Sequence, residues 1–132
     1  MNTSIVQGLE QQLEDAKALI TRRNMALKLA GNHEFRALIL EGFCMRDCAR
    51  FAQESADPAL PPESRADALA MAQAGGHLKR YLSAAFQMGA GAESSLGDLE
   101  LNLEEARFEE AAAEGNSDDD VNLADETHGD LA

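Results

Sequence analysis

The chain has 132 residues, which is the length of one domain and too short for two separate cores. It contains no Trp and one Tyr, and it is rich in Ala, Leu, Glu and Gln, which is the composition of helices rather than of a compact enzyme. Through residue 90, ten Lys and Arg balance ten Asp and Glu, so the net charge of −13 arises in residues 91–132, which hold fourteen acids and one base, Arg107. An acidic end on a neutral body repels nucleic acid and lipid headgroups and suits a basic partner.

Residues 3–30 predict one long amphipathic helix. The steps between its apolar positions are four, four, three, four and seven, close to a heptad seam, with Arg23 in the missing place. These positions are Ile5, Leu9, Leu13, Ala16, Ile20 and Leu27. Gly31 is expected to close this helix, and Asn32 to cap the next one.

Residues 33–56 predict a second helix that is apolar around most of its circumference, which indicates burial on most sides. Cys44 and Cys48 lie four residues apart on one face of it, a spacing poorly suited to a disulfide. Reduced thiols in a cytoplasm are the simplest interpretation. No signal peptide and no apolar run of about 20 residues is visible.

The segment 57–62 holds all three prolines and predicts a break, after which Pro62 starts a third helix that runs to Met88. Inside it, Gly75-Gly76 either produces a kink or lets another helix approach closely. Gly89-Ala90-Gly91 is expected to end it. We expect a core built from the second and third helices by Phe35, Ile39, Phe43, Phe51, Leu78, Leu82 and Phe86.

A fourth helix is expected to start at Ser94 or Ser95, with Asp98 in a capping position. Its short heptad seam is Leu96, Leu99, Leu103 and Ala106, and glutamates on its other faces repel one another until a basic partner relieves them. Residues 115–132 predict disorder. The expected fold is therefore all-α, with the long first helix packed on a hairpin formed by the second and third helices. The expected organisation is a charge-neutral helical domain at 1–91, an acidic amphipathic helix at 92–114 and a disordered acidic tail at 115–132.

No motif of catalysis or cofactor binding is present: the sequence has no phosphate loop, dinucleotide fingerprint or nucleophile elbow. A metal site formed by Cys44, Cys48, His33 and His77 is the best of the candidates, but buried core thiols are favoured. Residues 79–81 with Arg46 and Arg50 form a basic group, which we interpret as a solvated, ion-paired face rather than a nucleic-acid site. We expect no catalytic residue, no metal and no cofactor.

Residues 32–43 read Asn-x-x-Phe-x-x-Leu-Ile-x-x-Gly-Phe, and are followed by an Asp57-Pro58 turn, a Gly-x-Leu-Lys-x-Tyr segment at 76–81 and an acidic helical end. In these motifs, over about residues 5–112, the chain resembles small helical proteins encoded among the structural genes of tailed bacteriophages. The resemblance implies a role in the virion or in its assembly and carries over no catalytic residue. It implies the cytoplasm of the bacterial host, with incorporation into the virion left open.

Three functions remain open. The first is a non-enzymatic phage structural or assembly protein that self-associates as a homo-oligomer through coiled-coil seams and meets a basic or capsid-type protein. The second is an acidic inhibitor, for example an anti-defence or transcription-modulating protein, that occupies the basic surface of a nucleic-acid-binding enzyme. An enzyme is third. Candidate seam residues are Leu9, Leu13, Ala16, Ile20, Leu27, Leu96, Leu99 and Leu103; candidate docking acids are Glu104, Glu105, Glu109, Glu110, Asp118, Asp119 and Asp120.

Overall fold

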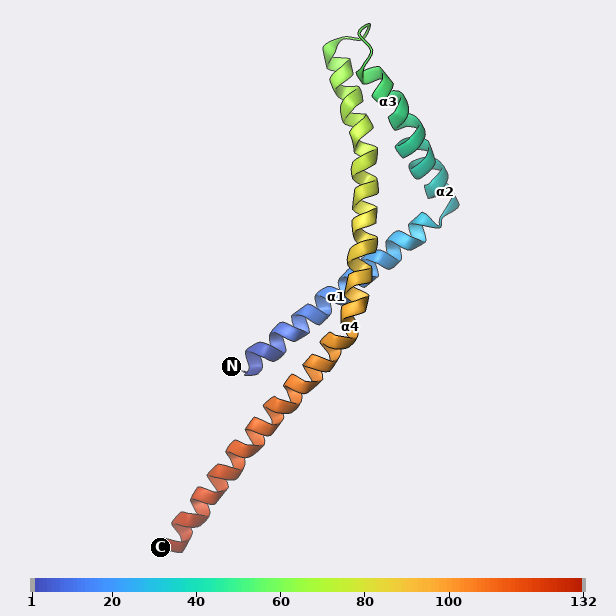
Figure 1. The fold of residues 1–132 in the computed structure, drawn as a ribbon. Coiled ribbons are helices and arrows are strands. Elements are labelled where there is room, and N and C mark those ends of the chain that lie inside the picture. Colours follow the sequence, from blue (N-terminus) through green and yellow to red (C-terminus); the bar gives the residue numbers. More distant parts are fainter. Residues whose placement is uncertain (1, 132) are drawn as a thin grey trace. The chain divides into compact units, whose positions relative to one another are not determined.

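The protein is all-α, as expected, in a computed structural model that describes the backbone of residues 2–131 and the side chains of residues 4–115 (Figure 1). Helix α1 (Asn2–Ala30) is followed by α2 (His33–Phe35), the π-helix η1 (Arg36–Asp47), α3 (Cys48–Ser55) and α4 (Pro62–Leu131). The described backbone contains no strand. The chain divides into two compact units: a terminal unit (Met1–Lys17 and Glu93–Ala132) and a central unit (Ala18–Ala92).

Two helix boundaries in the central unit follow from local side-chain chemistry. Asn32 caps α2, because its Oδ1 accepts a hydrogen bond of 2.9 Å from the backbone N–H of Phe35. After the proline-rich turn, α4 begins at Pro62, where the missing N–H has no helical partner to lose. Both predicted starts are confirmed.

The helical segment 33–55 is not the uniform α-helix that the apolar pattern predicts. Its middle twelve residues form the π-helix η1, in which the backbone N–H bonds to a carbonyl five residues earlier. Gly42 fits this wider turn, because a Cβ atom there would come within 2.9 Å of the carbonyl oxygen of Ala37. An apolar pattern that covers most of a helix cannot distinguish the two hydrogen-bond registers.

The prediction that one helix ends at Gly89-Ala90-Gly91 and another starts at Ser94 or Ser95 is wrong, because α4 runs without a break from Pro62 to Leu131. No glycine in the described backbone has a positive φ, so neither Gly89 nor Gly91 forms a left-handed cap. One face of α4 stays buried or half-buried through this region, at Ala85, Gly89, Ala92, Leu96, Leu99 and Leu103. This packing outweighs the cost of glycine in a helix, about 1 kcal/mol per residue.

The disordered segment expected over 115–132 is not confirmed. The bounds of α4 extend to Leu131, and the side chains of residues 116–132 lie outside those that the structure describes. The charge-based division at residues 91 and 114 therefore stays a prediction about composition, and α4 continues across both positions.

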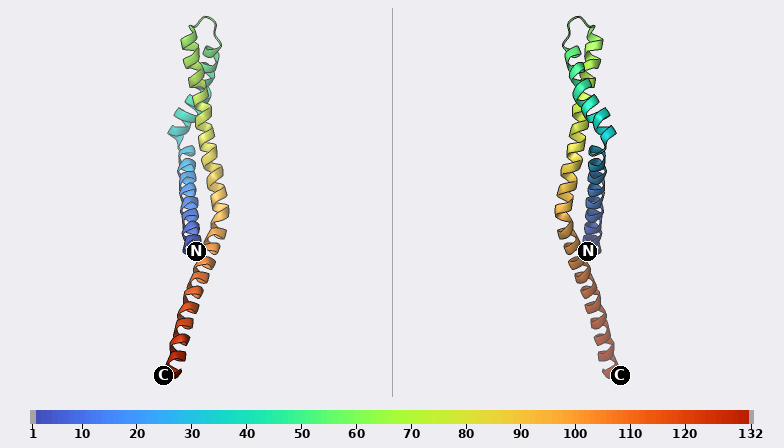
Figure 2. Two further views of the ribbon diagram at one scale, coloured as in Figure 1. Left: turned by 90° about the vertical axis from the view of Figure 1, so that its left-hand side faces the viewer. Right: turned by 90° about the vertical axis from the view of Figure 1, so that its right-hand side faces the viewer.

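The core of the central unit joins α1 to the hairpin formed by η1, α3 and the first part of α4, which Figure 2 shows in two views. Ala26 of α1 clusters with Leu82 and Ala85 of α4, and three partly buried side chains cover them: Phe35, Leu40 and Phe86. Small residues bring the helices close. Gly75 lies against Cys44 and Cys48, and Gly89 lies against the side-chain stem of Arg23. The close approach predicted at Gly75 is confirmed.

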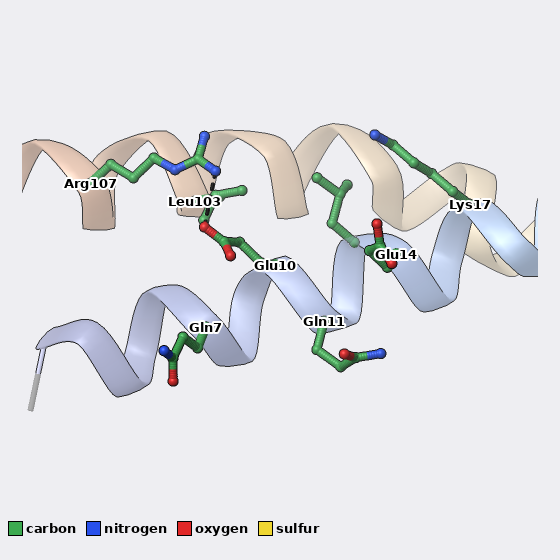
Figure 3. A pocket seen from close by; sticks show the side chains of 8 residues that line it. Gln7, Glu10, Gln11, Glu14, Lys17, Leu103 and Arg107 are labelled. Carbon is green, nitrogen blue, oxygen red and sulfur yellow. Dashed lines mark hydrogen bonds and ion pairs between the residues drawn. The ribbon is translucent and has the colours of Figure 1, made fainter.

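In the terminal unit, the first half of α1 runs antiparallel to α4 (Figure 3). Val6, Ala16 and Leu103 are buried, and Leu9, Leu13, Leu96 and Leu99 are half-buried. The two heptad seams therefore lie on residues that pack within one chain. At its two ends the α1 stripe differs from the prediction: Ile5 and Leu27 are 57% and 53% exposed, and the neighbouring Val6 and Ala26 are buried instead.

Candidate functional site

An ion pair joins the two helices of the terminal unit. The Arg107 Nη2 lies 3.1 Å from the Glu10 Oε1, and Figure 3 shows the guanidinium reaching from α4 to α1. Both side chains are about half exposed, so solvent screens the pair and its contribution to stability is about 0.2–1 kcal/mol. The pair has a second consequence: the single base of residues 91–132 is directed towards α1.

A groove of about 560 Å³ follows this edge of the terminal unit. Leu13 and Leu103 contribute its apolar part, and the remaining lining residues are polar or charged: Gln7, Glu10, Gln11, Glu14, Lys17 and Arg107. Acids and bases occur in equal number along it, two of each. This edge is therefore close to neutral, although the sequence that follows residue 90 is strongly acidic.

The other side of α4 in the terminal unit is different. Leu101 and Phe108 lie seven residues apart, two helical turns, on the side of α4 opposite the buried Leu103. Leu101 is 54% exposed and Phe108 is 75% exposed. A shallow hollow of about 380 Å³ lies here, lined by Leu101, Glu104, Glu105, Phe108 and Glu109. We call these five residues the acidic ridge.

The acidic ridge combines exposed apolar surface with three carboxylates and has no basic residue in its lining. Leaving a phenylalanine ring in water costs free energy that burial would recover, about 25 cal/mol per Å² of apolar surface. Carboxylates one turn apart on a helix also repel one another. Both costs fall when a partner with an apolar part and a positive charge covers the ridge.

Cys44 and Cys48 are free, buried thiols that meet Gly75 of α4. The Cys48 Sγ donates a hydrogen bond of 3.4 Å to the carbonyl oxygen of Met71. Burial raises the pKa of the Cys44 thiol above its ordinary value; nearby Cys48 adds to the increase and Lys79 partly offsets it. Because the thiolate is the reactive form, this environment suits a packed side chain better than a nucleophile.

Other candidate residues have the following positions. Leu82 is buried; Phe35, Ile39, Phe43, Phe51, Leu78 and Phe86 are half-buried in the central unit, and Ile20 is half-buried on α1. Of the docking acids, Glu104, Glu105 and Glu109 line the acidic ridge, and half-buried Glu110 lies on the seam side of α4. The side chains of Asp118, Asp119 and Asp120 lie outside those that the structure describes.

Sequence reasoning missed Leu101 and Phe108. The signal for them was present, since two apolar residues separated by seven positions stand among glutamates on the side of the helix away from Leu96, Leu99 and Leu103. The predicted apolar surface of this segment is the seam alone.

Part of the basic group predicted on the central unit forms ion pairs with acidic residues of the same unit. Arg50 lies 3.4 Å from Glu54 and 3.9 Å from Asp47. Over the described residues, no three His, Cys, Asp or Glu side chains gather as metal ligands do. Within the same residues, no helix combines the length and apolar character that crossing a membrane requires.

Comparison of the chain with protein-family models, with curated proteins and with solved structures gave no match.

Proposed function

We propose that this protein is a non-enzymatic assembly protein of the kind that tailed bacteriophages use in building the virion, and that it binds a basic protein surface through the acidic part of α4. One observation carries the proposal. Residues 93–114 hold eight acids and one base, and that base, Arg107, is paired with Glu10 of α1. The acids of the ridge thus remain for a partner.

The phage assignment is supported by the resemblance over residues 32–43 and 76–81. Those motifs lie in α2, η1 and α4, where Asn32 caps α2 and Gly42 fits the π-helix. These residues shape the helices and carry no chemistry. That is consistent with an assembly protein, whose fold has to present a binding surface to its partner. We place no catalytic residue, metal or cofactor in this function.

We also propose that the protein self-associates, but through a surface other than the predicted seams. The seam residues of α1 and α4 in the terminal unit, among them Leu13 and Leu103, already lie beside each other within the chain. A homo-oligomer would therefore use other apolar residues. Leu27, one of the predicted seam residues, is 53% exposed and is free of this intrachain packing.

The test is binding to the head and connector proteins encoded by neighbouring genes, each purified and mixed with the full-length chain. Light scattering after gel filtration gives the mass of the protein alone and of any complex. We expect a complex with a basic partner that weakens as salt is added, and that is lost when Glu104, Glu105 and Glu109 are all replaced by Gln. A matched variant with Glu34, Glu41 and Glu63 replaced by Gln removes the same charge from the central unit and should still bind.

An acidic inhibitor of a nucleic-acid-binding enzyme is the second candidate. The observation that favours it is the helical placement of the acids at 93–114, because an ordered row of carboxylates resembles a row of phosphates more closely than a tail would. Competition separates the two functions. An inhibitor would displace DNA from a purified phage or host nuclease with strong salt dependence, whereas an assembly protein would bind a virion protein and leave the nuclease unaffected.

A further inference from the structure

The central unit shows how this chain satisfies a phenylalanine ring that lies beside carboxylates. The guanidinium carbon of Arg50 lies 4.7 Å from the centre of the Phe51 ring, within the range of a cation–π interaction. The same guanidinium lies 3.4 Å from the Glu54 carboxylate and 3.9 Å from that of Asp47. One arginine therefore interacts with a ring and two acids at once.

The acidic ridge has the ring and the acids of this arrangement and lacks the arginine. Phe108 is 75% exposed, and Glu104, Glu105 and Glu109 surround the hollow beside it. Within the described residues, no Lys or Arg forms an ion pair with these three glutamates. The adjacent Arg107 does not fill the place, because its guanidinium is bound to Glu10.

We propose that the acidic ridge binds an arginine side chain of a basic segment on the partner protein, with the guanidinium over the Phe108 ring and against the ridge carboxylates. This inference rests on the proposed function and names the residue type that the partner supplies. The aliphatic stem of the arginine lies along the hollow towards Leu101. The stem shields apolar surface from water, which a small cation without such a stem would leave exposed.

Arginine suits the ridge better than lysine for two physical reasons. Its guanidinium is planar, so it stacks on an aromatic face while its N–H groups point outward to carboxylates. The guanidinium is also less strongly hydrated than an ammonium group, so it loses less hydration free energy when it leaves water. A second copy of this chain is a poor occupant, since its residues 1–90 carry no net positive charge, with ten bases and ten acids, and its residues 91–132, with fourteen acids and one base, would repel the ridge. Nucleic acid is excluded by the same repulsion.

The experiment measures binding of two labelled peptides to the full-length protein by fluorescence anisotropy. The peptides have the same length and spacing of charge, one with Arg and the other with Lys at every basic position, on an Ala and Ser background. We expect the Arg peptide to bind about fivefold more tightly. Phe108→Leu keeps most of the apolar area and removes the ring, so it should weaken the Arg peptide about fivefold and bring the two peptides to equal affinity.

Tyr81→Leu is the matched control. Tyr81 is also an exposed aromatic residue of α4, at 60%, but it follows Lys79 and Arg80 rather than acids. This variant should bind both peptides as the original chain does. Circular dichroism of each variant confirms that its helix content is unchanged, as expected for exposed positions.

The outcomes are distinct. Equal affinity of the two peptides for the original chain, or an unchanged preference after Phe108→Leu, overturns the arginine site. If binding is then still lost on replacing Glu104, Glu105 and Glu109 by Gln, the proposed acidic docking function survives without it. If neither peptide binds, and no virion protein binds either, both proposals fail.

Discussion

Gly75 of α4 lies directly against the thiol of Cys48 in α3: a Cβ atom added to Gly75 would come within 2.5 Å of the Cys48 Sγ and 3.1 Å of the Cys44 Cα. The absence of a side chain at one residue thus sets how closely the two arms of the hairpin approach. The adjacent Gly76 has nothing within 4 Å of the same hypothetical atom. Two consecutive glycines therefore offer a test of packing against helix propensity.

Gly75→Ala should destabilise the protein, and Gly76→Ala should stabilise it. Overpacking typically costs about 1–3 kcal/mol, whereas Gly to Ala at an open helical site gains up to about 1 kcal/mol. Urea denaturation followed by circular dichroism measures both. Equal effects of the two substitutions would mean that α4 does not meet the cysteine face at Gly75.

Gly91→Ala should raise the stability by about 1 kcal/mol, because a Cβ atom at Gly91 meets nothing within 4 Å and α4 is helical there. If the chain instead ended a helix at Gly91 with a positive φ, alanine would be strained and stability would fall. The sign of the change in melting temperature therefore decides between one helix and two. Gly97→Ala, at another open position, serves as the reference.

Leu103→Ala should destabilise the protein by about 2–5 kcal/mol, since Leu103 is 4% exposed and its truncation leaves a cavity. Leu101→Ala should change stability by less than about 0.5 kcal/mol, because that side chain is 54% exposed. Denaturant midpoints of the two variants give the comparison. A small effect of Leu103→Ala would show that α1 and α4 do not pack through their seams.

The pKa of the Cys44 thiol is raised, mainly by burial, from its ordinary value of 9.0. The unfolded chain therefore loses this proton at a lower pH than the folded chain does, so the contribution of Cys44 to stability is fully present below about pH 8 and is lost as the pH rises through the thiol range. Unfolding free energies at pH 7 and pH 10 measure this loss. Cys44→Ala, itself compared at both values, should show a smaller decrease than the original chain.

The sequence predicts those helix ends that depend on one local residue. Asn32 provides a side-chain cap and Pro62 provides a helix start, and each acts within a few residues of itself. Gly89 and Gly91 carry the opposite local signal, and there the prediction is wrong because burial of the Leu96 to Leu103 face continues the helix. A local propensity of about 1 kcal/mol loses to packing against a segment that is distant in the sequence.

The sequence predicted the acidic residues of the candidate site but not the exposed apolar residues beside them. Counting charges placed the acids at 104, 105 and 109, but assigned all the apolar surface of the segment to a seam. In the structure α1 packs on that seam. A count of charges cannot predict this packing. The packing of α1 on Leu103 leaves Leu101 and Phe108 on the uncovered side of α4, where their spacing of seven residues had already placed them on a shared face.

The number of residues in the helical segment from Phe35 to Cys48 fixes which way Cys48 faces. Each residue of a helix turns the backbone by a set angle, in the π-helix η1 as in an α-helix, so the direction of Cys48 relative to Phe35 depends on how many residues lie between them. Losing one residue would rotate α3 about its own axis and carry its cysteine away from Gly75. Over evolutionary time, substitutions in this stretch should therefore be tolerated more readily than insertions or deletions, and homologues should keep the distance from Phe35 to Cys48 even where its residues differ.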